Sequence, residues 1–337
     1  MRAVKRICAV IVGLVFLVAG LLKLMDPVGT GLIVEEYMKF FHTPFAIPLS
    51  KYLGTALALL ETILGAGLVT GVWRIHIGIA TGVVLVAFTS LTLVLWIVNP
   101  AMDCGCFGEA VHLTHFQSLM KNVVLLVLWA LAFFLPGAEP ESRTVKHVAF
   151  FITVFSALAF TVGSYLGIPT LDFTAFKPGA VLFQAGGDAD APILSICDRD
   201  GEYCDESLAS GPVLVVSAYD YDKLGEKSHE RIREAMDAAA LSGVPVFMVV
   251  SGDIPEEASF SADRRTLMTL NRSNGGATLF RDGHLIAKWP VIKLPTAETL
   301  SEILSNDPVE ATIKENSPRR LKLQGFLLYV FAVILLL

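Results

Sequence analysis

Long apolar runs dominate this chain and limit it to a membrane-spanning architecture. Several runs reach the roughly 20 residues that a helix needs to cross a bilayer. They cover 7–25, 50–72, 75–98, 116–135 and 147–168. Of the 337 residues, 54% are apolar and only 17% are charged, which is less charge than soluble domains carry. The sequence therefore predicts a multi-pass helical membrane protein.

Basic residues predict how these helices are oriented. Arg2, Lys5 and Arg6 precede the first run, and the polar link after the fourth run carries Arg143 and Lys146. Because Lys and Arg concentrate on the cytoplasmic side of membrane helices, the N-terminus is expected in the cytoplasm and the chain in the inner membrane. The loop after the third run and the long polar segment that follows the fifth run then share the periplasm.

A short cysteine motif follows the third apolar run. It reads Asp103-Cys104-Gly105-Cys106-Phe107-Gly108. Cysteines two positions apart form a disulfide only through a sharp bend, which the intervening glycine permits. Such a bridge is strained and easily reduced, as is typical of catalytic or regulatory disulfides. The motif therefore favours dithiol chemistry at Cys104 and Cys106 over a structural loop with unrelated thiols or half of a metal site.

The same motif resembles the MauE and DoxX families of small membrane proteins. The similarity covers roughly residues 5–136, including Gly13 to Lys23, Glu35-Glu36-Tyr37 and Phe116 to Asn122, and its most specific part is the CGCFG string. MauE is implicated in maturing a disulfide-rich periplasmic dehydrogenase subunit for methylamine utilisation, and DoxX is associated with a thiosulfate:quinone oxidoreductase. The resemblance thus implies a membrane domain with redox chemistry, without fixing its substrate.

Ionisable residues interrupt the apolar runs. Glu61 lies near the middle of its run, where a charged group costs roughly 2.5–3.5 kcal/mol on insertion scales. It is therefore expected to face the bundle interior and to meet Lys23 or Lys121. One reading is a structural ion pair or a protonated glutamate. The other is a proton path or a quinone-side group that serves the cysteine loop, with Asp103 and Asn122 as further supporting candidates.

Residues 170–318 differ from the apolar runs, because charge rises and short strands alternate with helices. The expected elements are a strand at 212–217, a helix at 224–241, a strand at 244–250, a hairpin at 277–289 and a helix at 296–304. This is the order of a thioredoxin-like domain. However, the usual place of its CxxC motif holds 219–223 without a cysteine, and 272–276 lacks the proline that precedes the hairpin. An ordinary thioredoxin centre is therefore not expected.

A second cysteine pair lies near the start of this domain. Cys197 and Cys204 flank Asp200-Gly201, a dipeptide typical of two-residue hairpin turns. That register places the two cysteines opposite each other with Cα atoms about 5.5 Å apart, within disulfide range. A structural disulfide is the leading interpretation, and an exchanging dithiol or two free thiols are the alternatives. Cys8, in the first apolar run, is expected to be an inert core residue.

Together these features predict a four-helix membrane bundle with extra helices and an inserted α/β thioredoxin-like domain. Its expected parts are a transmembrane domain at 1–136, a linker and fifth helix at 137–169, a periplasmic domain at 170–318 and a membrane segment at 319–337. The final uncharged stretch, 325–337, is short for a span. Either its helix begins in the exit from the soluble domain, or the chain is truncated.

The leading functional hypothesis is a membrane thiol–disulfide relay on an extracytoplasmic protein. Cys104 or Cys106 would attack while the other resolves, and electrons would leave to a quinone or a second protein. Lys121, His112 or His115 would approach the pair and lower a thiol pKa. The rival is a non-catalytic scaffold with a redox-dead soluble domain, and a small-solute carrier ranks last. Membrane lipid is an expected partner, whereas a net charge of −6 without a basic stripe argues against nucleic acid. No metal is expected.

Overall fold

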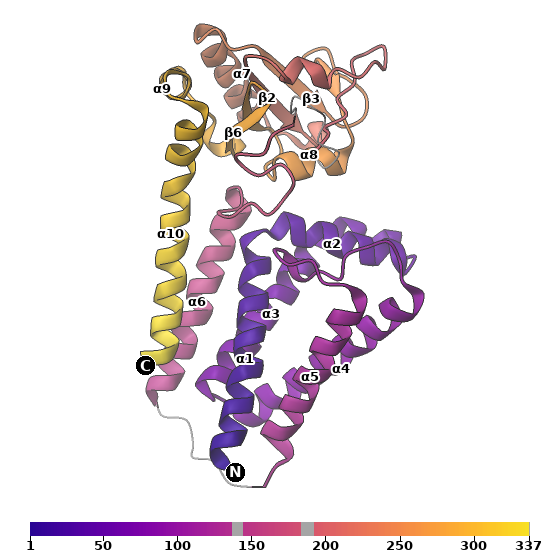
Figure 1. The fold of residues 1–337 in the computed structure, drawn as a ribbon, viewed down its shortest axis with the longest axis vertical. Helices are drawn as coiled ribbons and strands as arrows, with labels where there is room; N and C mark the ends of the chain where they lie inside the picture. Colours follow the sequence, from indigo (N-terminus) through magenta and orange to yellow (C-terminus); the bar gives the residue numbers. More distant parts are fainter. Residues whose placement is uncertain (137–143, 183–191, 337) are drawn as a thin grey trace. The chain divides into compact units, whose positions relative to one another are not determined.

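The computed structural model describes residues 1–136, 144–182 and 192–336 (Figure 1). It divides into two compact units, Met1–Gly163 with Gln324–Leu337, and Ser164–Leu323. Within the described residues, 5 segments are long and apolar enough to cross a membrane. They are Arg2–Met25, Pro44–Thr70, Arg74–Val98, His115–Phe134 and Thr144–Leu166. The prediction of a multi-pass membrane protein is confirmed at this level. Arg143, one of the residues used to predict orientation, lies outside the described part.

The helices of the first unit begin and end close to the expected positions. They are α1 (Arg2–Met25), α2 (Pro27–Phe40), the 3-10 helix η1 (Pro44–Leu49), α3 (Ser50–Thr70), α4 (Arg74–Val98), α5 (His115–Phe134) and α6 (Thr144–Leu166). α1 packs against α3, and α4 packs against α5 (Figure 1). Leu17 and Leu21 of α1 share a buried cluster with Ala66 and Val69 of α3.

Glycines allow α1 and α3 to approach closely. A Cβ atom on Gly20 would lie 2.3 Å from Thr62 Oγ1, and one on Gly65 would lie 2.4 Å from the backbone nitrogen of Leu17. Small residues at such contacts are typical of membrane helix pairs, because backbones in van der Waals contact supply the attraction that apolar burial cannot supply in lipid. This close pairing brings Lys23 of α1 opposite Glu61 of α3.

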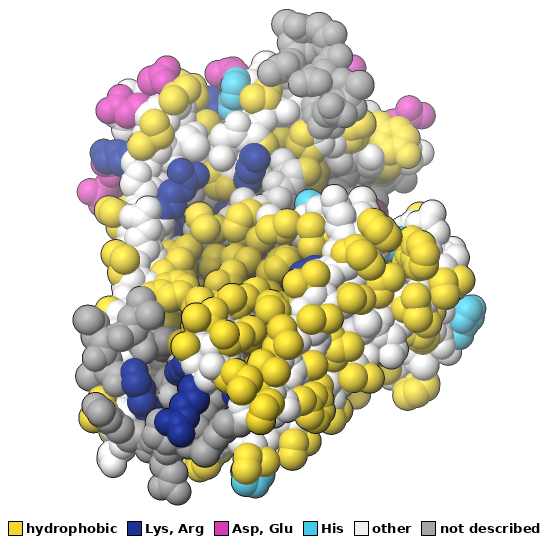
Figure 2. Space-filling view, turned by 60° about the horizontal axis from the view of Figure 1, so that its bottom comes forward, with side chains coloured by type: hydrophobic (Ala, Val, Ile, Leu, Met, Phe, Trp, Pro, Cys, Tyr) yellow, Lys and Arg dark blue, Asp and Glu magenta, His cyan; other side chains and the backbone are white. Residues whose placement is uncertain are grey.

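The outer faces of the helices are apolar. Large side chains that point outward include Val83, Val86, Val124, Val127 and Phe155, which belong to α4, α5 and α6. Figure 2 shows hydrophobic side chains over a large continuous part of the face it presents. Because such a surface is stable only against lipid tails, the helices contact membrane lipid.

The C-terminal helix begins in the exit from the soluble domain, as one of the two alternatives for this stretch had it. α10 runs from Pro308 to Leu336, so it begins inside the segment assigned to the soluble domain. Asp307 accepts a hydrogen bond from the backbone N–H of Val309 at 3.0 Å, which is a helix-start cap that the sequence analysis overlooked. Phe326 stacks on Phe160 of α6, with ring centroids 4.6 Å apart. A membrane location for 319–337 stays a prediction.

The second unit is built on a mixed sheet. Its strands are β2 (Pro212–Ala218), β3 (Val246–Val250), β4 (Phe260–Ser261), β5 (Gly276–Arg281) and β6 (His284–Trp289), in the order β4-β3-β2-β5-β6. β2 and β3 are parallel, as are β3 and β4, whereas β5 is antiparallel to both β2 and β6. The helices are α7 (Glu226–Leu241), α8 (Arg264–Leu270) and α9 (Ala297–Ser305). The sequence analysis missed β4 and α8, which are both short.

Both faces of this sheet are buried, as the apolar run of β2 indicated. Leu214 and Val216 face a cluster that includes Ile232 of α7. Val213 and Val215 face the opposite cluster, because successive side chains of a strand point to opposite sides. A strand that is apolar on both faces lies centrally in its sheet, and β2 occupies the middle position.

The expected register around Asp200-Gly201 is wrong. Cys197 pairs with Tyr203 instead of Cys204, and the N–H of Asp198 donates to the carbonyl of Glu202 at 3.0 Å. The loop is therefore one residue longer than a two-residue turn, which moves Cys204 out of the position opposite Cys197. Both cysteines are free thiols here. A bridge between them stays a prediction.

Candidate functional site

The candidate site is the loop between α4 and α5, at one end of the helical unit. α4 ends at Val98, because Asn99 takes a left-handed conformation with φ of 49°. The loop then passes through Cys104 to the short strand β1 (Cys106–Glu109). α5 begins after Thr114, whose side chain forms a reciprocal capping box with Gln117. The two caps fix the ends of the cysteine loop.

The glycine bend brings the two sulfurs together. Gly105 has φ of +63°, and a Cβ atom there would lie 2.3 Å from Cγ2 of Ile33. The Sγ atoms of Cys104 and Cys106 lie 3.1 Å apart, with both residues in the thiol form. The hydroxyl of Tyr37, on α2, donates to the carbonyl of Cys104 at 2.6 Å. The bend and this hydrogen bond hold the sulfurs where a bond between them needs little backbone movement.

The two thiols differ in pKa because their surroundings differ. The hydrogen bond between the sulfurs of Cys104 and Cys106 is the main reason that the pKa of Cys106 lies well below its ordinary value. Burial opposes the shift, while Lys121, Lys23 and the Ser118 hydroxyl reinforce it. The same hydrogen bond raises the pKa of Cys104, and burial raises it further. Cys106 therefore carries the thiolate of the reduced pair.

Two lysines supply positive charge near the sulfurs. Lys121 Nζ lies 4.9 Å from the centroid of the Phe107 ring, which directly follows Cys106. Lys23 Nζ lies 2.7 Å from Glu61 Oε1 and 2.8 Å from Oε2, and both side chains are buried. Of the two partners that the sequence suggested for Glu61, Lys23 is the one that pairs with it.

An apolar cavity of about 400 Å³ opens beside the cysteines. Its polar lining groups come from Lys23, Tyr37, Glu61, Lys121 and Asn122, together with both cysteines. The remaining wall is mainly apolar and includes Phe16, Leu57, Leu85, Phe88 and Leu125. A cavity of this size and lining suits a small organic molecule with a flat polar-edged ring or an apolar chain.

Other candidate residues lie outside this arrangement. The Asp103 side chain is 59% exposed, and its Oδ2 lies 3.1 Å from His112 Nδ1. His115 Nε2 lies 3.1 Å from the carbonyl oxygen of Pro100. Both rings are hydrogen-bonded within the loop, and the approach of a histidine to the thiols stays a prediction. Asn122 instead donates to Phe88 and Thr92, which ties α5 to α4.

Three residues that contact the cysteine loop were not predicted from the sequence to belong to the site. They are Ile33, Tyr37 and Ser118, which lie on α2 and α5. The first two are far from the motif in sequence, and only the packing of α2 brings them to the loop. The one available signal was Tyr37 within the Glu35-Glu36-Tyr37 segment of the resemblance. Across the described residues, no group of three or more His, Cys, Asp or Glu side chains is arranged to hold a metal ion.

Comparison with known proteins matches the helical part of the chain to a described family. Residues 1–135 match the family described as methylamine utilisation protein MauE. The helical unit thus contains a MauE family domain. Protein TlpB of Flavobacterium psychrophilum is 30% identical to the chain over 97 residues, which cover 27% of the chain and 25% of TlpB. The chain therefore spans about a quarter of that relative. No solved structure matches the chain. The DoxX likeness and the thioredoxin-like fusion stay predictions.

Proposed function

We propose that the MauE family domain is a membrane thiol–disulfide oxidoreductase that passes electrons from an extracytoplasmic protein dithiol to a quinone. The observation that carries this proposal is a pair of thiols 3.1 Å apart on the wall of an apolar cavity of about 400 Å³. A pair on such a wall can react with a partner from the aqueous side and with a lipid-soluble acceptor from the cavity.

Cys106 is the sulfur that exchanges with the partner protein. It is partly exposed, whereas Cys104 is only 6% exposed. A partner thiolate attacks Cys106 of the Cys104–Cys106 disulfide, which forms a mixed disulfide and leaves Cys104 reduced. The second partner thiolate then attacks the partner sulfur of that bond. The partner leaves as a disulfide, and the pair is left as a dithiol.

Return to the disulfide form removes two electrons and one proton from the pair, since Cys106 is already a thiolate, and the second proton needed for quinol comes from the medium or from Glu61. A quinone supplies this chemistry when it occupies the cavity, since its reduction to quinol takes up two electrons and two protons. The Cys106 thiolate starts the step, and the Cys104 thiol closes the ring. Glu61, held beside the cavity by Lys23, is placed to exchange a proton with a group bound there.

We assign the mixed-sheet unit a partner-binding role without redox chemistry of its own. The strand order β3-β2-β5-β6, with one parallel pair followed by an antiparallel hairpin, supports a thioredoxin-like layout. β2 leads into Tyr219–Lys223, which contains no cysteine. A periplasmic location for this unit follows from the positive charge of the N-terminus.

Quinone reduction by the reduced protein tests the proposal. The full-length chain in liposomes is reduced, freed of reductant and mixed with a short-chain ubiquinone. We expect one quinol to form for each pair of thiols lost at Cys104 and Cys106. Cys8→Ser is the matched control, because Cys8 is buried in a separate cluster with Ala9 and Ala132. If the thiols persist in the presence of quinone, the proposed electron path is wrong.

A further inference from the structure

A second cavity lies wholly within the Ser164–Leu323 unit and takes no part in the proposed electron transfer. Its volume is about 70 Å³. One water molecule needs roughly 10–15 Å³ of such space, so the cavity has room for several waters or one small polar group. Its charged and amide side chains come from Asp172, Lys177, Arg272, Lys288, Asn316, Arg319 and Arg320.

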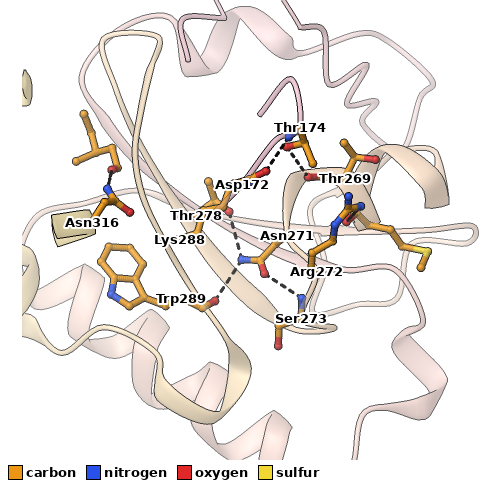
Figure 3. Close-up of polar contacts among 12 residues, drawn as sticks. Asp172, Thr174, Thr269, Asn271, Arg272, Ser273, Thr278, Lys288, Trp289 and Asn316 are labelled. Atoms are coloured by element: carbon orange, nitrogen blue, oxygen red, sulfur yellow. Dashed lines mark hydrogen bonds and ion pairs between the residues drawn. The ribbon is translucent and has the colours of Figure 1, made fainter. Parts of the chain in front are cut away.

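One positive and one negative side chain in this wall neutralise each other. Lys288 Nζ lies 2.6 Å from Asp172 Oδ2, and the two side chains are 5% and 12% exposed (Figure 3). Burial by itself would raise the pKa of Asp172, but Lys288 and Thr174 outweigh it and hold the pKa below its ordinary value. The carboxylate is therefore ionised and its charge is offset by Lys288.

The remaining charge in the wall is positive. Among the described residues, no carboxylate lies within ion-pair distance of Lys177, Arg319 or Arg320. Arg319 donates to the carbonyl of Lys288 at 2.9 Å, which fixes its guanidinium at the cavity. Arg272, also in this wall, is buried and donates to the carbonyl of Met268 at 2.9 Å. Cations gathered around one space repel each other unless an anion occupies it.

Chain connectivity places this cavity close to membrane helices. Ile168 lies two residues beyond Leu166, the last residue of the candidate span α6. Arg319 and Arg320 lie on α10, only about 6–8 Å along the helix from Gln324 at a rise of 1.5 Å per residue. Beyond that point α10 packs against α6 through Phe326 and Phe160. The wall of the cavity therefore includes chain that directly follows a candidate membrane span.

We propose that this cavity binds the phosphate group of a phosphoester. The phosphate comes either from an anionic lipid headgroup or from a soluble phosphate ester. The planar guanidinium groups of Arg319 and Arg320 offer paired donors that match phosphate oxygens, and Lys177 adds a point charge. Basic pockets beside membrane helices are typical headgroup sites.

The test is calorimetric titration of the full-length protein in a nonionic detergent. The ligands are dioctanoyl phosphatidylglycerol, dioctanoyl glycerol without phosphate, and glycerol 3-phosphate. We expect the lipid with phosphate to bind, the lipid without it to bind at least tenfold more weakly, and Arg319→Gln with Arg320→Gln to raise the dissociation constant at least tenfold. Equal binding of glycerol 3-phosphate and phosphatidylglycerol would identify a soluble ester as the source, with the phosphate site intact.

Two further variants keep the result interpretable. Lys227→Gln with Lys293→Gln removes the same charge from exposed positions outside the cavity and should leave binding unchanged. Arg319→Lys with Arg320→Lys keeps the charge and should retain part of the affinity. Unchanged circular dichroism of all variants shows that they fold. Equal affinity of the Gln pair and the wild type, or an absence of binding by both phosphate ligands, overturns the proposal.

Discussion

At the scale of single residues, one glycine and two thiols define the site. Gly105 adopts a left-handed φ in a position where Ile33 leaves no space for a Cβ atom. The two cysteines on either side of it are chemically alike in sequence, but they differ in the folded protein. Cys104 is buried and its pKa is raised, whereas Cys106 is partly exposed and its pKa is lowered. The roles of the two residues should therefore not be interchangeable.

Trapping with glutathione disulfide distinguishes the two cysteines. In a background of Cys8→Ser, Cys197→Ser and Cys204→Ser, we expect Cys104→Ser to accumulate a glutathione adduct at Cys106, because no neighbouring thiol resolves it. Cys106→Ser should form the adduct at least tenfold more slowly, since its remaining thiol is buried and more basic. Intact mass measured against time gives both rates, and equal rates would remove the distinction.

The acidity of Cys106 predicts a pH dependence. A lowered pKa keeps the thiolate present at pH values below about 8.5, where an ordinary cysteine is protonated, and the thiolate is lost only as pH falls through the lowered value. In the same background, the first alkylation of the pair by iodoacetamide should therefore stay fast through neutral pH. Cys104→Ser removes the largest cause of the shift, so its rate profile should move toward higher pH. Profiles that coincide would show that Cys104 has no effect on Cys106.

At the scale of elements, the pairing of α1 with α3 creates the buried ion pair. The glycine contacts that bring these helices together also set Lys23 opposite Glu61. The pair lines the cavity and its ammonium contributes to the lowered pKa of Cys106. If Lys23 and Glu61 form only a structural ion pair, their substitution should change stability alone. If they also handle protons, substitution should slow quinone reduction as well.

Breaking and replacing the pair should give opposite stability effects. Glu61→Gln leaves a buried ammonium without its counterion, which typically costs about 3–5 kcal/mol, so the thermal midpoint should fall. Lys23→Met with Glu61→Leu removes both charges and should recover most of that loss. If the pair transfers protons to the bound quinone, the double variant should be stable but should reduce quinone at least tenfold more slowly than the wild type. Normal quinone reduction by the double variant would assign the pair to structure alone.

At the scale of the whole molecule, the proposal requires the cysteine loop and the mixed-sheet unit to face one compartment. The positive charge of Arg2, Lys5 and Arg6 and the number of helices that follow them favour this arrangement. Among the described residues, 5 candidate spans lie between the N-terminus and the mixed-sheet unit, and this odd number predicts opposite sides of the membrane for the two. The same arrangement would allow a bound partner protein to reach Cys106.

Labelling with a membrane-impermeant maleimide checks this arrangement in intact spheroplasts. Both Cys197 and Cys204 are partly exposed, so they should react from outside. In a variant without the natural cysteines, Arg2→Cys should react only after the membrane is permeabilised. Labelling of Arg2→Cys from outside, or protection of Cys197 and Cys204, would contradict the proposed orientation.

The sequence by itself determined the features that depend on local pattern. Length and hydropathy defined the membrane helices, because a bilayer demands about 20 apolar residues for each crossing. The alternation of strand and helix signals defined the β2, α7, β3 and β5–β6 elements. Gly105 between two cysteines located the site, since only a bend at that position brings i and i+2 thiols together.

Tertiary structure decided what depends on distant residues meeting. Glu61 was matched to Lys23 instead of Lys121 only by the packing of α1 against α3. The position of α2 delivered Tyr37 and Ile33 to the loop, and the surrounding groups made Cys106 the acidic thiol. One additional loop residue moved Cys204 away from the position opposite Cys197, a difference that local turn preferences did not resolve. Helix and strand signals are local, whereas pairing, burial and pKa depend on atoms that only the folded chain brings together.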